Sequence, residues 1–164
     1  MNVKVNNFQP VKISQTLTTD TNAYATGDVL VATVAVPVLS TVQGQKNLRI
    51  RIDQIGLIDT AVQNGALDIV ILDAAVSLGT VNAAVGITDA NVVNVVKVIN
   101  VSASNYNTLK AADNSVANID LAAPIYVTTT TGAFYLGLIS RDSKTYAATS
   151  LTFRAQVTII NQDV

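Results

Sequence analysis

The sequence predicts an all-β protein, an antiparallel β-sandwich of jelly-roll type with eight or nine strands and one short helical turn. Three observations predict this fold class. Hydrophobic residues make up 49% of the chain and charged residues only 13%, where about 25% charged is usual. Every acidic residue is Asp, so the good helix former Glu is absent, while Val and Thr, which favour strands, are abundant. Short apolar or alternating segments are separated by turn residues.

The two clearest strands lie within residues 47–76, and we expect them in the middle of the fold. From Leu48 to Ile52, every second residue is apolar and the residues between are polar, which predicts a strand with one buried face. Residues 67–72 are apolar on nearly both faces, so this strand is expected to be covered on both sides. Asn64-Gly65 lies between the two strands, and both residue types tolerate a positive φ, which indicates a loop tip.

The other strands follow from the same alternation. Pro37 cannot donate a ladder hydrogen bond, so it marks the end of a strand or an edge. The expected segments are residues 11–17, 29–38, 95–101, 119–121, 125–128, 133–139 and 151–159.

Turn-rich segments separate these strands. Thr88-Asp89 is a plausible helix cap, which predicts a short helical turn over residues 89–94. Loops are expected at Asp20–Asp28, 41–46, Ser102–Asn118 and Arg141–Ser150.

A chain of 164 residues predicts one domain, here residues 11–164, preceded by an N-terminal arm of residues 1–10. The arm is either a frayed terminus or a segment that orders on a neighbouring subunit. Because the chain is so apolar and carries so few charges, we expect part of its surface to be buried against other chains.

Composition also narrows the possible partners. The net charge is −1 and the sequence has no basic cluster, which argues against direct nucleic-acid binding. Cysteine is absent, so disulfides and thiolate metal sites are excluded. The longest apolar run, residues 29–39, is too short to span a bilayer, and residues 1–4 do not lead into a signal core. We therefore expect a soluble protein, synthesised in the cytoplasm, with no membrane partner.

The residues usual in catalysis are missing. The chain has no His, Cys or Glu, which removes the usual general base, nucleophile and raised-pKa acid. Ser143 and Lys144 are adjacent on a loop, and no third group orients them. We expect no enzyme activity and no cofactor.

Four aspartates of the central strands could in principle bind Ca²⁺, which takes six to eight oxygen ligands. No EF-hand-like spacing supports such a site, so solvated or Arg-paired aspartates are the preferred interpretation and no metal is expected. These residues are Asp53, Asp59, Asp68 and Asp73.

Polar and aromatic residues supply candidates for a protein interface. Two arginines project from one face of a central strand, where they are either surface charges paired with Asp or a subunit contact. Tyrosines are either interface anchors or half-buried strand residues. The candidates are Arg49, Arg51, Tyr24, Tyr106, Tyr146 and Arg141.

Three stretches, taken in order, resemble a family of small all-β virion structural proteins of tailed bacteriophages, of the capsid decoration type. The stretches are TDTNAYATGDVL (19–30), LDIVILDAAVSLGTVNAAVGITDANVVNVVKVI (67–99) and AFYLGLISRDSKTYAATSLTFRAQVTIINQD (133–163). The motif of the first stretch is complete at Asp20, Tyr24, Gly27, Asp28 and Leu30. Leu72-Asp73-Ala74 replaces the family's Phe-Asp-Ala, Asn91 replaces an Asp, and the match at Lys97-Val98-Ile99 is loose. Phe134-Tyr135-Leu136-Gly137 matches the aromatic strand.

The resemblance implies a capsid decoration (cement) protein on the outer surface of the phage head. Its partners would be the major capsid protein and copies of itself, as a homotrimer, and the loops and the arm would make the contacts. The resemblance does not fix the position in the particle. The alternative is a tail, neck or fibre-associated module, structural or glycan-binding, although only 5% of the chain is aromatic and Trp is absent. A third reading, an unrecognised hydrolase, is disfavoured by the missing His, Cys and Glu.

Overall fold

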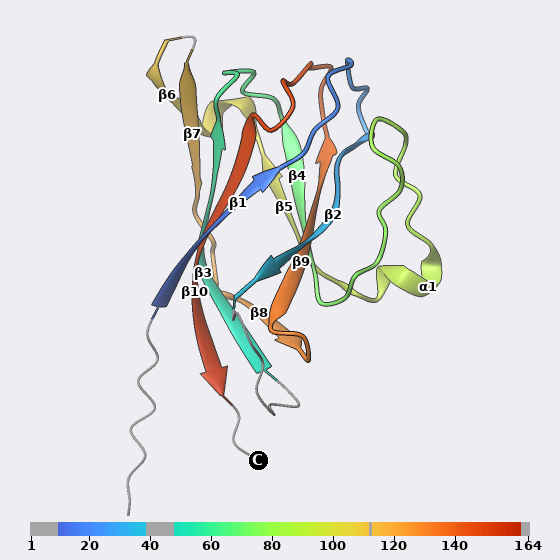
Figure 1. Cartoon of the computed structure of the whole chain (residues 1–164), viewed down its shortest axis with the longest axis vertical. Helices are drawn as coiled ribbons and strands as arrows, with labels where there is room; N and C mark the ends of the chain where they lie inside the picture. The colour runs from blue at the N-terminus through green and yellow to red at the C-terminus, as the bar shows by residue number, and fades with distance from the viewer. Residues whose placement is uncertain (1–9, 39–47, 112, 162–164) are drawn as a thin grey trace, which may run out of the picture.

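The computed structural model describes residues 10–38, 48–111 and 113–161. It confirms an antiparallel β-sandwich, with ten strands rather than the eight or nine expected (Figure 1). The predicted arm lies outside the described residues except for Pro10, which begins β1, and so does the expected loop at 41–46.

One sheet has six strands, in the order β1-β10-β3-β7-β6 with β8 also paired to β3, and the other has four, in the order β2-β9-β4-β5. The strands are β1 (Pro10–Leu17), β2 (Val29–Pro37), β3 (Leu48–Asp59), β4 (Leu67–Leu72), β5 (Val95–Val101), β6 (Tyr106–Lys110), β7 (Asn114–Ile119), β8 (Ile125–Thr129), β9 (Ala133–Ser140) and β10 (Leu151–Asn161).

Strand β3 is the centre of the six-stranded sheet. It pairs with β10 along one side, and on the other side with β7 and β8, which lie end to end. The second expected central strand, β4, lies between β9 and β5 in the other sheet. The two strands of residues 47–76 are therefore central as predicted, one in each layer, and the loop between them crosses from one sheet to the other. Asn64 in this loop has a φ of 49°.

The chain passes repeatedly from one sheet to the other. Among the described strands, only β4–β5 and β6–β7 are consecutive in sequence and paired with each other. The first strand, β1, pairs with the last, β10. This alternation between layers is the pattern of a jelly roll.

Apolar residues of the two inner faces form the main core. Alternate residues of β3, β8 and β10 point into it, and the rings of Phe134 and Phe153 meet edge to face with centroids 6.2 Å apart. Such contacts add to the stabilisation that the buried apolar area provides.

A second, smaller cluster explains why all six residues of β4 are buried. Residues 73–94 fold over the outer face of the four-stranded sheet, where Leu78 packs with Val70, Leu72 and Ile139. Figure 1 shows this green segment, which includes α1 (Asp89–Val92), beside β2 and β9. The sequence expectation that this strand is covered on both sides is confirmed, and the chain itself supplies the cover.

The tight fit between Gly137 and Leu78 yields a prediction. A Cβ at Gly137 would lie 2.5 Å from Leu78 Cδ1 and 3.2 Å from the carbonyl oxygen of Val31. We expect Gly137→Ala to push Leu78 off the sheet and to lower the free energy of unfolding by about 1–3 kcal/mol, as overpacking does. Urea denaturation measures the loss. The double variant G137A/L78A should lose less than the sum of the single losses, and a G137A protein as stable as the native one would contradict the prediction.

Two sequence expectations were wrong. Residues 102–118 are not a long loop, since they form the short η1 helix (Ala103–Asn105) and most of the β6–β7 hairpin. Small residues of β7, Ser115 and Ala117, are buried because they lie against β3, a pairing that their composition does not reveal. The strand expected at 119–121 is absent, because β7 ends at Ile119.

The helical turn expected at 89–94 is confirmed by α1. Thr88 occupies the N-cap position in an extended conformation, but its side chain makes no capping hydrogen bond. No helix in the described ranges is long and apolar enough to cross a membrane.

Candidate protein-binding surface

The outer face of the six-stranded sheet carries three of the four arginines of the chain, Arg49, Arg51 and Arg154. Their neighbours along each strand, such as Ile50 and Phe153, are fully buried, so alternation directs the arginines outward. No segment of the described chain covers this face as residues 73–94 cover the other sheet.

At one end of the face, Arg49 stacks on an aromatic ring. Its guanidinium carbon lies 4.4 Å from the ring centroid of Tyr126, which is 43% exposed. Arg51 lies two residues further along and pairs with Asp53, with 2.8 Å between Nε and Oδ1. Asp53 also accepts a hydrogen bond from the Thr158 hydroxyl at 2.9 Å. Arg51 is thus held by an Asp partner, whereas Arg49 forms an exposed cation–π pair.

In the middle of the face lies a groove of about 440 Å³ over Gly56. Gly56 forms the floor of this groove. A Cβ at this position would fill the floor, since it would lie 3.1 Å from the Ala117 carbonyl oxygen and 3.5 Å from a guanidinium nitrogen of Arg154. Among the residues that line it are Lys12, Ser14, Gln54, Asn118, Arg154 and Gln156. The β3–β10 pairing has a bulge at Asp53, which is the extra residue of β3. Beyond this bulge, Gln54 pairs with Gln156 and Gly56 with Arg154, which brings these lining residues together.

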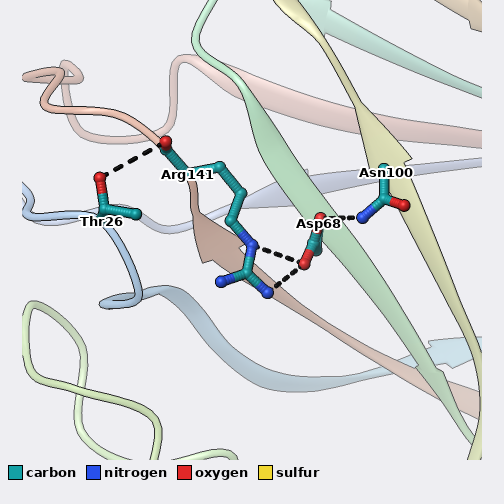
Figure 2. Close-up of polar contacts among 4 residues, drawn as sticks. All are labelled: Thr26, Asp68, Asn100 and Arg141. Carbon is teal, nitrogen blue, oxygen red and sulfur yellow. Dashed lines mark hydrogen bonds and ion pairs between the residues drawn. The ribbon is translucent and has the colours of Figure 1, made fainter.

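Arg141, another predicted interface residue, forms an ion pair with Asp68 of the same chain. Its Nε donates to Asp68 Oδ2 at 2.6 Å, and its Nη2 donates to the same oxygen. Asn100 donates to the other oxygen of Asp68 at 2.6 Å, and Asp68 is only 2% exposed. Figure 2 shows this cluster, in which Thr26 also donates to the Arg141 carbonyl oxygen. The pair joins the start of the 141–150 loop to β4.

The three predicted interface tyrosines lie in the interior. Tyr24 and Tyr146 are each 2% exposed, with ring centroids 6.2 Å apart in an edge-to-face contact, and Tyr106 is 9% exposed. Burial raises the pKa of all three phenols above its usual value, and the charges of Asp59 and Asp142 raise the pKa of Tyr106 and Tyr146 further. These side chains form core contacts, and so they offer no surface to a partner.

The four aspartates considered for a metal lie in separate surroundings. Asp53 pairs with Arg51, Asp68 with Arg141, and the buried Asp59 accepts hydrogen bonds from backbone N–H groups at 2.9 Å. Asp73 is exposed at the end of β4. Within the described parts of the chain, no three His, Cys, Asp or Glu side chains come together as metal ligands would.

Two residues of the surface were not singled out from the sequence. Tyr126 alternates with the buried Ile125 and Val127, a signal that could have placed it outward. Arg154 alternates with Phe153 and Ala155 in the same way, but only the strand register shows that it lies beside Gly56 of β3.

Comparison with known proteins gives a remote likeness among solved structures. No family model matches the chain. No curated protein matches it either. Among solved structures, a chain from the X-ray crystal structure of tomato aspermy virus is similar at 10% identity with a TM-score of 0.41, over 99% of this chain and 82% of that one.

Proposed function

We propose that this chain is a virion structural protein that decorates and stabilises a capsid shell through protein–protein contacts. The observation that carries the proposal is the asymmetry of the sandwich: its own chain covers one outer sheet face, while the other presents Arg49 stacked on Tyr126. The resemblance of three ordered sequence stretches to the decoration proteins of tailed phages supports the same role. The expected partners are the major capsid protein and further copies of this chain, as a homotrimer.

The residue types on this face suit a protein partner. Arg and Tyr are enriched at interfaces and among the residues that dominate binding energy. Because Arg49 already rests on the Tyr126 ring and Arg51 is held by Asp53, their side chains lose little freedom on binding. An outward sheet face with such restrained side chains is suited to binding another folded subunit.

Stabilisation of a shell would arise by repetition. An interface of ordinary size buries about 800 Å² per partner. When the same contact is made at every equivalent position and bridges neighbouring subunits, modest affinities combine through effective concentration. No catalytic step is needed, which is consistent with a chain that lacks His, Cys and Glu.

The test is binding to shells assembled without this chain. In co-sedimentation, the native protein should saturate the shells and raise the temperature at which they dissociate. We expect Arg49→Ala or Tyr126→Ala to weaken binding about 30-fold, the effect of losing a dominant contact of about 2 kcal/mol.

Lys97→Ala is the matched control, because it removes an exposed cation from β5 of the other sheet. It should bind like the native protein. Native protein that stays in the supernatant would reject the decoration role, and R49A and Y126A proteins that bind normally would reject this face as the contact.

A further inference from the structure

We propose that the groove over Gly56 binds a carboxylate, the Asp or Glu side chain of an extended acidic segment on a partner protein. The inference rests on the proposed function for the identity of that partner. The site itself is defined by the residues of β1, β3, β7 and β10 that surround the groove.

All the charged side chains that line the groove are positive. It includes two cationic side chains, Lys12 and Arg154, and no acidic one. The other polar lining residues are neutral hydrogen-bonding groups, Ser14, Gln54, Asn118 and Gln156. The cationic side chains of such a groove attract an anion, and the neutral polar side chains can form hydrogen bonds with the groups that flank this anion.

Arg154 differs from the other arginines in lacking a partner. Arg51 and Arg141 each pair with an Asp, and Arg49 stacks on Tyr126. Among the described residues, no carboxylate pairs with Arg154, and its Nε is buried without a hydrogen bond. A desolvated donor without an acceptor is unfavourable, so no internal partner holds this side chain in place. The planar guanidinium matches a carboxylate with two parallel hydrogen bonds.

A protein carboxylate fits the groove better than the phosphates of a nucleic acid. A nucleic acid needs a track of several cations and, if single-stranded, aromatic rings for its bases. The groove has two cations and no aromatic residue in its lining, and the net charge of the chain is −1. The amide side chains of Gln54, Asn118 and Gln156 instead suit the N–H and C=O groups of an extended peptide.

The experiment is an NMR titration of the isotope-labelled full chain with a capped peptide of alternating Gly and Glu. We expect saturable shifts of the backbone amides of Gly56, Asn118 and Gln156, which line the groove. The probes in parallel titrations are inorganic phosphate and an oligothymidine of equal charge.

Four variants define the site. Arg154→Gln should weaken peptide binding at least about tenfold. Arg154→Lys keeps the positive charge but loses the planar guanidinium with its paired donors, so it should weaken binding less. Asn118→Asp, nearly isosteric, places a carboxylate beside the groove and should compete with the peptide. Lys97→Gln, on the other sheet, should change nothing.

Each outcome decides the proposal. Groove shifts with the peptide that are lost in R154Q and N118D support it. An absence of groove shifts, tighter binding of the oligothymidine, or equal peptide binding by R154Q overturns it. Phosphate binding as tight as the peptide's would also overturn it, since the groove would then hold any small anion. If native protein binds shells and R154Q binds them equally, this inference fails alone; if native protein does not bind shells but the peptide shifts persist, the proposed function fails alone.

Discussion

Above about pH 10 the protein should lose stability steeply, by about 3 kcal/mol for each further pH unit. Burial raises the pKa of Tyr106 and Tyr146, and nearby aspartate charges raise it further. In the unfolded chain both phenols ionise near pH 10. The folded chain keeps both protons above this pH, so at these two residues it binds two more protons than the unfolded chain does. The stabilisation is therefore complete below pH 10 and disappears as the pH rises towards the folded-state values.

Urea denaturation at a series of pH values between about 8 and 12 measures this slope, and the part of the tyrosinate absorbance that comes from Tyr106 and Tyr146 should rise only as the protein unfolds. Tyr106→Phe and Tyr146→Phe each remove one ionising group and should each halve the slope. Y106F is the cleaner variant, because the buried Tyr106 hydroxyl has no hydrogen-bond partner among the described residues to lose. A free energy of unfolding that stays level from pH 10 to 12 would contradict the burial of these rings.

Replacing Arg141 by Met should lower the free energy of unfolding by about 3 kcal/mol. The variant leaves the carboxylate of Asp68 buried without its cation, with Asn100 as a remaining donor. This loss of stability is at the lower end of the range for removing one partner of a buried ion pair. The Arg141 side chain is 44% exposed, so water can reach the position that it leaves. Urea denaturation at neutral pH measures it.

The double variant R141M/D68N separates charge burial from packing. It removes the carboxylate as well as the guanidinium, and it should recover more than half of the lost stability. If R141M is as stable as the native protein but binds shells less well, Arg141 acts at an interface, and the internal ion pair contributes little.

Alternation along the chain was enough to place most strands. It located β5, β9 and β10 within about two residues and the first half of β3, because one face of each must be apolar to be buried. It also identified β4 as covered on both sides. Residues 106–119 escaped detection because β6 is mostly exposed and pairs with β7, while the burial of β7 depends on its pairing with β3. Small polar residues there resemble a loop. Pairing between strands distant in sequence has no local signature.

The candidate surface was predictable in part for the same reason. Arg49 and Arg51 could be assigned to an outward face from the pattern of β3 alone. Arg154 and Gly56 are neighbours only because β10 lies antiparallel to β3 in a particular register. The sequence could not show that the tyrosines are buried or that Arg141 pairs with Asp68, because these residue types suit both an interface and an interior.

The pairing of β1 with β10 bears on how fast the protein can fold. Pro10 lies opposite Thr158, so the six-stranded sheet closes only when two segments almost 150 residues apart have met. Every such closure loses chain entropy before its contacts form. Chains dominated by distant pairings fold in milliseconds to seconds rather than microseconds. During synthesis, β1 cannot pair until β10 has been made, and its pairing edge is open to other molecules in the meantime.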